Sequence, residues 1–232
     1  MAPKKYKQKK KQAAQLRQQQ SPKPEKRKPA KFNKNLLIGV VIIAVIVVAF
    51  AGLALSGQFG GNKTPTSIDP TKVLLQTTAG NITIDLRTDK PITSTNFINL
   101  VKSGKYDGTT FYRTVKDFMI QGGKINSTVP TINDEIGNNN RNSNYTIAMA
   151  KTSDANSATS EFFINTVDNG NKIVDQQGHK FDQIYTEFGT VIDGKDVVDA
   201  IANAPATENP NITGEISVPV NPVTIIHASI IT

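Results

Sequence analysis

The stretch FYRTVKDFMIQGG, residues 111–123, is the most informative part of the sequence. It places one arginine, Arg113, between two short apolar pieces that read as strands, and a pair of glycines ends the second piece. If the second piece is a strand, Met119 and Gln121 point to one face and Phe118 to the other, because side chains alternate along a strand; a bend in the chain would alter this. Taken alone, this stretch is at least as consistent with a barrel core and a surface ion pair as with a functional site.

Short apolar runs between Gly- and Asn-rich clusters continue on both sides of this stretch. Residues 73–77 and 82–86 flank an Ala-Gly-Asn turn and predict a hairpin. Residues 92–102 predict a helix, with Thr93 and Ser94 as capping candidates. Many short strands with two helices favour a β-barrel or sandwich with helices at its ends. The remaining elements expected are strands at 110–112, 118–121, 146–150, 161–165, 185–191 and 223–231, and a helix at 196–203.

The formal net charge of +8 is concentrated at the N-terminal end of the chain. Residues 1–35 hold 13 of the 27 Lys and Arg and only one of the 19 acidic residues, which leaves 14 bases against 18 acids beyond them. This basic arm is rich in Lys, Gln and Pro and has almost no large apolar residue, so we expect it to be disordered. We expect it to set membrane topology and to touch anionic lipid. RNA or ribosome binding is the alternative, but we expect no nucleic-acid partner, because only Tyr6 and Phe32 offer aromatic stacking surfaces.

Residues 36–55, LLIGVVIIAVIVVAFAGLAL, form an apolar run without a charged side chain. About 20 residues at 1.5 Å each span a hydrocarbon core of roughly 30 Å. We therefore expect a transmembrane helix or uncleaved signal anchor in the cell membrane. A cleaved signal peptide is the alternative, although its apolar region would be shorter, about 7 to 15 residues. Because Lys31 and Lys34 adjoin the run, we expect a cytoplasmic N-terminus and an extracytoplasmic C-terminal part.

Composition limits the chemistry of the rest of the chain. Residues 56–71 predict a flexible Gly-, Thr- and Pro-containing linker, and residues 72–232 are long enough for one sizeable core. The chain has no cysteine, which excludes thiol nucleophiles, disulfides and Cys-rich zinc sites. Its two histidines, His179 in a polar segment and His227 in the last strand pattern, lack a paired-ligand spacing. We expect neither a metal nor a cofactor.

Several motifs, in order along the chain, resemble those of the cyclophilins, a family of peptidyl-prolyl cis-trans isomerases. The stretch 111–123 resembles the family's Phe-x-Arg and Phe-Met-x-Gln-Gly-Gly signature. The other matching motifs are TNF at 95–97, INDE at 132–135, TIAMA at 146–150, SEFFIN at 160–165, YTEFG at 185–189 and VIDG at 191–194. The resemblance covers residues 72–232 and implies a closed eight-stranded antiparallel β-barrel capped by two α-helices.

The resemblance also implies an active site. Arg113 matches the catalytic arginine, and Gln121 matches the glutamine that helps to hold it. Glu161 stands where the family usually has Gln, and we expect its carboxylate near Arg113, where pairing would weaken the reach of the guanidinium. The positions that match substrate-binding residues are Phe118, Met119 and Phe163 in the proline pocket, Ala150 and Lys151 beside the peptide backbone, Tyr185 in place of His, and Ile173 and Val174 in place of an aromatic-Leu pair.

The implied reaction needs no metal, nucleotide or covalent intermediate. An X-Pro bond turns slowly because rotation breaks amide resonance, behind a barrier of roughly 18–20 kcal/mol. A site that binds the twisted amide better than the planar forms catalyses the rotation. The expected partners are proline-containing polypeptides, exported or surface proteins that are folding. The alternative is a catalytically weak cyclophilin-like peptide-binding module, which Glu161 and Ile173 suggest.

Overall fold

The computed structural model of this protein describes residues 68–137, 139–175 and 177–231. The basic arm and the apolar run predicted at residues 1–55 lie outside these ranges. Within the described ranges, none of the helices has the length and apolar character needed to cross a membrane.

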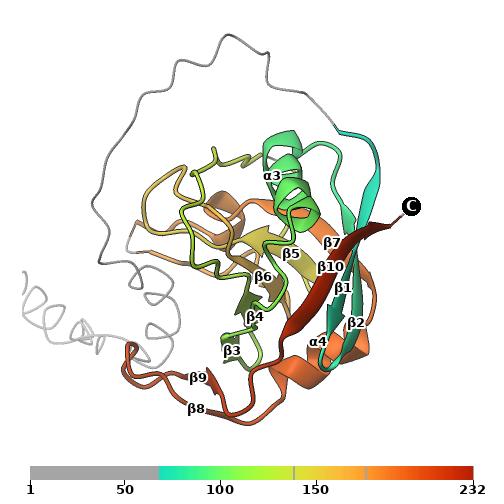
Figure 1. The fold of residues 1–232 in the computed structure, drawn as a ribbon. Helices are drawn as coiled ribbons and strands as arrows, with labels where there is room; N and C mark the ends of the chain where they lie inside the picture. Colours follow the sequence, from blue (N-terminus) through green and yellow to red (C-terminus); the bar gives the residue numbers. More distant parts are fainter. Residues whose placement is uncertain (1–67, 138, 176, 232) are drawn as a thin grey trace, which may run out of the picture. The chain divides into compact units, whose positions relative to one another are not determined.

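Eight of the described strands form a single curled antiparallel sheet, in the order β10-β1-β2-β7-β5-β6-β4-β3 (Figure 1). A separate small sheet pairs two further strands, β8 and β9. The strands are β1 Thr71–Thr77, β2 Gly80–Leu86, β3 Arg113–Val115, β4 Met119–Gly122, β5 Thr146–Met149, β6 Phe162–Asn165, β7 Glu187–Asp193, β8 Ala206–Glu208, β9 Ile216–Pro219 and β10 Ile225–Ile231. The predicted hairpin is confirmed as β1 and β2, which pair in register from Thr71↔Leu86 to Thr77↔Gly80.

The closed barrel expected from the resemblance is corrected to a curled sheet with two edges, β10 and β3. The expected strand at 110–112 makes only one isolated bridge, Thr110↔Thr224. Backbone hydrogen bonds from Phe111 N to Val223 O (2.9 Å) and from Ile225 N to Thr109 O (2.8 Å) tie the two edges together at that point. Closure is partial because β3 begins only at Arg113 and is three residues long, so no strand ladder forms between β3 and β10 in the described chain.

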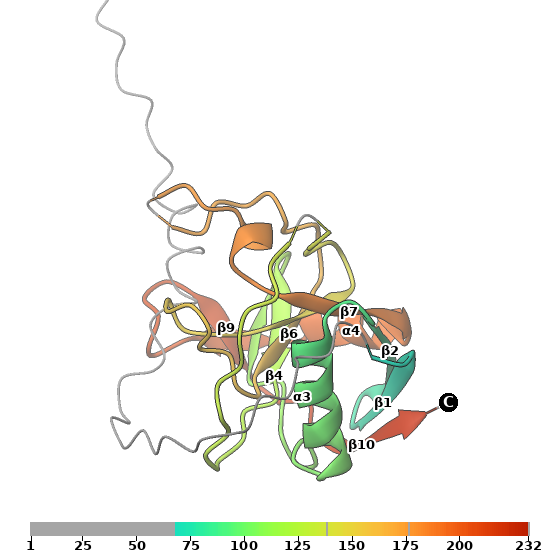
Figure 2. The ribbon, with the colours of Figure 1, turned by 90° about the horizontal axis from the view of Figure 1, so that it is seen from above.

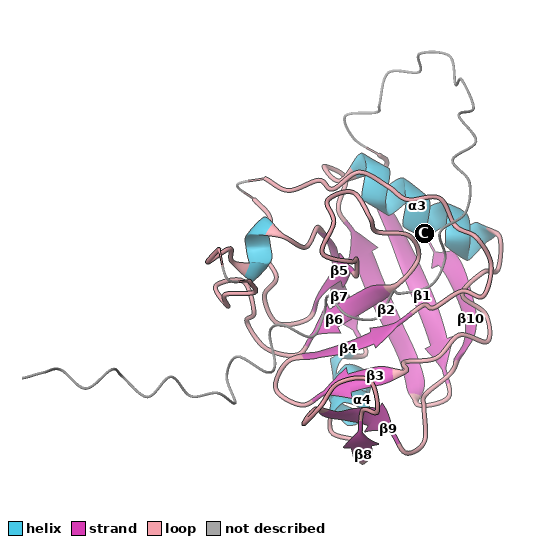
Figure 3. Cartoon of the chain, turned by 90° about the vertical axis from the view of Figure 1, so that its left-hand side faces the viewer, coloured by secondary structure: helices cyan, strands magenta, loops and turns pink. Residues whose placement is uncertain are grey.

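The two predicted helices are confirmed as α3, Pro91–Lys102, and α4, Lys195–Ala202. They lie at opposite ends of the sheet (Figure 3). α3 packs against β10 and β7 (Figure 2). A short 3₁₀ helix, η2, spans Phe181–Gln183.

The cap of α3 differs from the prediction, because Thr93 and Ser94 are buried residues of its first turn. The residue before the helix makes no side-chain cap bond, and Pro occupies the first helical position. Instead, the backbone N–H groups of Ile92 and Thr93 donate to the carboxylate of Glu135, at 3.1 and 2.8 Å. The cap therefore comes from a carboxylate about 40 residues along the chain.

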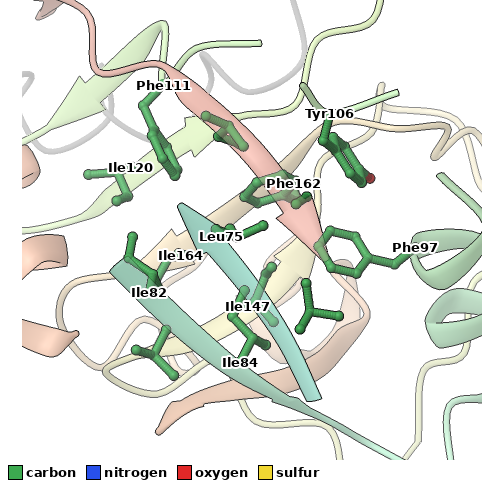
Figure 4. Packing of buried hydrophobic residues seen from close by; sticks show 14 of the residues in the cluster. Leu75, Ile82, Ile84, Phe97, Tyr106, Phe111, Ile120, Ile147, Phe162 and Ile164 are labelled. Carbon is green, nitrogen blue, oxygen red and sulfur yellow. The ribbon is translucent and has the colours of Figure 1, made fainter. Parts of the chain in front are cut away.

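The main core fills the inside of the curl (Figure 4). Alternation along β1 and β2 buries Leu75, Ile82 and Ile84 completely. On α3, Phe97 packs its ring against Phe162, with centroids 5.6 Å apart in an edge-on geometry. The strands that carry the predicted site are thus anchored from behind by a packed aromatic and aliphatic core.

Candidate active site

Arg113 and Gln121 face each other across the β3–β4 hairpin. The register pairs Arg113 with Gln121 directly, and the turn between the strands places Asp117 in the left-handed region, at φ 56°. Arg113 Nη1 donates to Gln121 Oε1 at 3.2 Å. The sequence motif therefore folds so that the two residues matched to the catalytic arginine and its holding glutamine make direct contact.

The main partner of Arg113 is Glu215, a residue that the sequence analysis did not identify. Arg113 Nε donates to Glu215 Oε1 at 2.8 Å, and Nη2 donates to Oε2 at 2.7 Å. Both side chains are buried, with 3 % of Arg113 and 5 % of Glu215 exposed. Burial on its own would raise the pKa of Glu215, but the hydrogen bonds and charge of Arg113, with hydrogen bonds from Ser217 and Asn209, lower it overall. Glu215 is therefore ionised at neutral pH and forms a bidentate pair with Arg113.

Glu161 does not make the pair with Arg113 that the sequence analysis expected. Its Oε2 accepts a short hydrogen bond from the Tyr112 hydroxyl and a 3.0 Å bond from Gln121 Nε2. Burial, together with the adjacent Glu161 carboxylate, raises the pKa of Tyr112, so this hydroxyl remains a donor. The Tyr112 hydroxyl, at 2.5 Å, and Glu161 Oε2 both accept from the nitrogen of the Gln121 amide, so the oxygen of that amide faces Arg113. Glu161 thus helps to orient Gln121, whereas Glu215 is the carboxylate that binds the guanidinium of Arg113.

An apolar cluster separate from the main core adjoins this polar group. Its buried members are Phe118, Met119, Ala148, Ala150, Phe163, Phe181 and Tyr185. The β4–β6 register places Phe163 opposite Gln121, so the cluster and the polar group share a border. Burial raises the pKa of Tyr185, which keeps its hydroxyl protonated.

Phe181, on η2, is the central ring of this cluster and was missed by the sequence analysis. Its centroid lies 5.6 Å from that of Phe118, 5.5 Å from that of Phe163 and 4.5 Å from that of Tyr185. The sequence signal that could have identified it is an aromatic residue in an otherwise polar loop, four positions before the YTEFG motif. The signal is weak because loop aromatics serve many purposes.

Alternation along β4 is confirmed only in part. Met119 lies in the apolar cluster and Ile120 lies in the main core, as a strand requires. The alternation does not extend to Phe118, which packs with Met119 in the apolar cluster because the chain bends there. β4 begins at Met119, so Phe118 belongs to the turn after Asp117 and is not bound by strand alternation.

The other predicted site residues lie in the cluster, on the surface or, for Lys151, in a separate ion pair. Ala150 and Val174 pack in or against the cluster, whereas the side chain of Ile173 is 54 % exposed. Lys151 extends its ammonium to Asp134, with Nζ to Oδ2 at 2.6 Å. The structure therefore brings most of the predicted site together but leaves Ile173 and the Lys151 ammonium outside the cluster.

The comparisons with known proteins agree on one family. Residues 72–230 match the family described as cyclophilin type peptidyl-prolyl cis-trans isomerase/CLD. The peptidyl-prolyl cis-trans isomerase cyp18 of Streptomyces antibioticus is 43% identical over 171 residues, which cover 68% of this chain and 98% of that protein. The peptidyl-prolyl cis-trans isomerase A of Dickeya dadantii is 38% identical over 197 residues, which cover 82% of this chain and 97% of that protein.

Solved structures show the same fold at lower identity. A cyclophilin type peptidyl-prolyl cis-trans isomerase from Cryptosporidium parvum superposes with a TM-score of 0.57 at 23% identity, covering 70% of this chain and 98% of that one. A second structure of that protein, in the presence of the dipeptide Ala-Pro, gives a TM-score of 0.55 at 24% identity, covering 69% and 99%. The match in sequence along nearly the whole length of the bacterial relatives, together with this fold, shows that the chain belongs to the cyclophilin-type peptidyl-prolyl cis-trans isomerase family.

Proposed function

We propose that this protein is a peptidyl-prolyl cis-trans isomerase in which Arg113 stabilises the twisted X-Pro amide. The observation that carries the proposal is a buried arginine, held in one orientation, at the border of an apolar cluster. Among the described residues, three of the five guanidinium N–H groups have partners, on Glu215 and Gln121. One N–H on each terminal nitrogen is left to donate to a substrate.

The proposed chemistry is differential binding rather than proton transfer. When the X-Pro bond twists, the proline nitrogen regains a lone pair that can accept a hydrogen bond from Arg113. A hydrogen bond made only in the twisted state lowers the barrier, because the planar forms gain nothing from it. The low-dielectric surroundings of the buried guanidinium strengthen this interaction. Gln121 contributes by holding the Nη1 side of the guanidinium.

The apolar cluster is the proposed seat of the proline ring. Phe118, Met119 and Phe163 would contact the ring, and Phe181 packs behind two of these side chains. The backbone of Ala150 and Lys151 would lie along the peptide. Two contacts support that segment: Ala150 N donates to Glu161 O at 2.9 Å, and Lys151 is tied to Asp134.

The proposed substrates are proline-containing segments of exported or surface proteins during folding. This proposal comes from the sequence: residues 36–55 would anchor the protein in the cell membrane, with the basic arm in the cytoplasm, near anionic lipid, and the isomerase domain outside. Residues 56–71 would give the domain reach from the membrane surface.

One of the two observations that favour the alternative, a catalytically weak binding module, is not supported by the structure. The alternative was suggested by a Glu161–Arg113 pair, and Glu161 instead binds Tyr112 and Gln121. We therefore favour the isomerase.

The test is catalysed cis-trans exchange of an X-Pro peptide, followed by protease-free NMR with the full-length protein in detergent. We expect the wild type to catalyse exchange and Arg113→Ala to lose roughly 10²- to 10³-fold, as when one preorganised donor is removed. Arg141→Ala is the matched control, because Arg141 is an exposed arginine on a loop, and it should retain wild-type catalysis. A well-folded wild type that does not catalyse exchange would overturn the proposal.

A further inference from the structure

We infer that Glu215 is a positioning residue for catalysis, which fixes the plane and the direction of the Arg113 guanidinium. The inference rests on the proposed function, since it takes Arg113 as the group that meets the substrate. Glu215 lies outside every motif that suggested the family, in the segment between β8 and β9.

Arg113 and Glu215 form a bidentate ion pair, in which one carboxylate binds two nitrogens of the planar guanidinium. Two parallel N–H···O bonds, at 2.8 and 2.7 Å, engage Nε and Nη2 of Arg113. A bidentate contact of this kind fixes the guanidinium plane, whereas a single contact leaves it free to rotate. Gln121 holds the remaining nitrogen, Nη1. With all three nitrogens engaged, the two remaining N–H groups point in fixed directions before a substrate arrives.

The segment that presents Glu215 is itself well supported. Glu215 N donates to Ile212 O at 3.1 Å, and Asn209 N donates to Glu215 O at 2.8 Å, so the backbone closes a tight loop. Ile212 is buried and anchors the tip of this loop. The next strand, β9, lies beside β3, the strand that carries Arg113 (Figure 3). The small β8–β9 sheet therefore supports the loop that places the Glu215 carboxylate against Arg113.

The two carboxylates at this site have different partners. Glu161 orients Gln121 and does not touch Arg113 within the described structure, whereas Glu215 contacts Arg113 directly. Removing Glu215 would leave a buried guanidinium with one polar partner, free to turn toward other acceptors. A misplacement of a catalytic group by about 1 Å can cost roughly 10²-fold in rate.

The test is a double-variant cycle measured on the full-length protein by NMR exchange of an X-Pro peptide. Glu215→Gln keeps the size of the side chain but replaces one acceptor oxygen with an amide, so one bond to the guanidinium is lost. We expect the exchange rate at saturating peptide to fall about 10- to 100-fold, with peptide affinity changed less than about twofold. In an Arg113→Ala background, Glu215→Gln should have no further effect on the rate. Glu208→Gln is the matched control, because Glu208 is an exposed carboxylate on β8 of the same small sheet, and it should behave as wild type.

The outcomes separate this inference from the proposed function. An active wild type in which Glu215→Gln leaves the rate unchanged, or lowers it equally with and without Arg113, overturns the inference alone. An inactive, folded wild type overturns the proposed function. Should Glu215→Gln fail to fold, Glu215→Asp serves instead: it keeps the charge but shortens the reach, and should lower the rate while the Arg113 Nε–H resonance shifts. An unshifted resonance and an unchanged rate in Glu215→Asp would also overturn the inference.

Discussion

Shortening the Phe181 side chain should lower the free energy of unfolding, less in Phe181→Leu than in Phe181→Ala. Phe181 is 1 % exposed and has three aromatic neighbours with centroids 4.5 to 5.6 Å away. Phe181→Leu keeps an apolar side chain but loses three ring pairs, which at about 0.5 kcal/mol each gives a loss of about 1.5 kcal/mol or more. Phe181→Ala also opens a cavity, and such changes cost about 3–5 kcal/mol in all.

The assay is urea unfolding of the full-length protein followed by circular dichroism, comparing the midpoint and slope with those of the wild type. Ile173→Ala is the control, since that side chain lies in the same loop but is 54 % exposed, and its effect should stay within about 0.5 kcal/mol. Both Phe181 variants should also bind an X-Pro peptide more weakly, because Phe118 and Phe163 lose their common packing surface. If Phe181→Ala lowers the free energy of unfolding by less than about 1 kcal/mol, Phe181 is not the centre of the cluster and the argument fails.

Three further predictions follow from the contacts of single carboxylates. Glu161→Gln should keep the exchange rate within about threefold of wild type, because Glu161 is not a ligand of Arg113 and the amide oxygen that replaces its carboxylate oxygen can still accept from Gln121. A large increase, measured by NMR exchange, would support the binding module instead. Glu135→Ala should lower the free energy of unfolding by about 0.5–2 kcal/mol, since it removes the cap of α3, and urea unfolding that shows no loss would rule out that role. The pKa of Glu215 is lowered from its ordinary 4.5, so the stabilisation that its carboxylate gives is present above about pH 4.5 and is lost as the pH falls through the lower pKa of the folded state. The difference in thermal stability between the wild type and Glu215→Gln, measured between pH 3 and 7, should shrink as the pH falls, and a difference that does not depend on pH would contradict this.

Local features of the fold could be predicted from the sequence because local interactions determine them. The hairpin of β1 and β2 follows from alternating burial around a short turn, and α3 and α4 follow from the spacing of their apolar residues. The Arg113–Gln121 contact was also within reach, since eight residues and one turn separate the two side chains.

The features that could not be predicted depend on pairings between distant parts of the chain. Glu215 is 102 residues from Arg113, and no pattern near either residue indicates the other. The Glu135 cap of α3 and the position of Phe181 likewise depend on how loops return to the sheet. Glu161 lies close to the Arg113–Gln121 pair, as expected, but its carboxylate binds Gln121 and Tyr112 instead of Arg113. Its position in the sequence does not show which way the carboxylate points. Each of these loops is fixed by tertiary contacts rather than by its own propensity.

The most direct test of the account is the rate of X-Pro rotation on the enzyme itself. NMR line shapes of an isotope-labelled peptide at saturating protein give the on-enzyme rotation rate separately from binding and release. With Arg113→Ala, we expect that rate to fall roughly 10²-fold or more while peptide affinity changes little, because Arg113 is proposed to act on the twisted amide. An on-enzyme rotation rate equal to that of the wild type, with only weaker binding, would contradict the account.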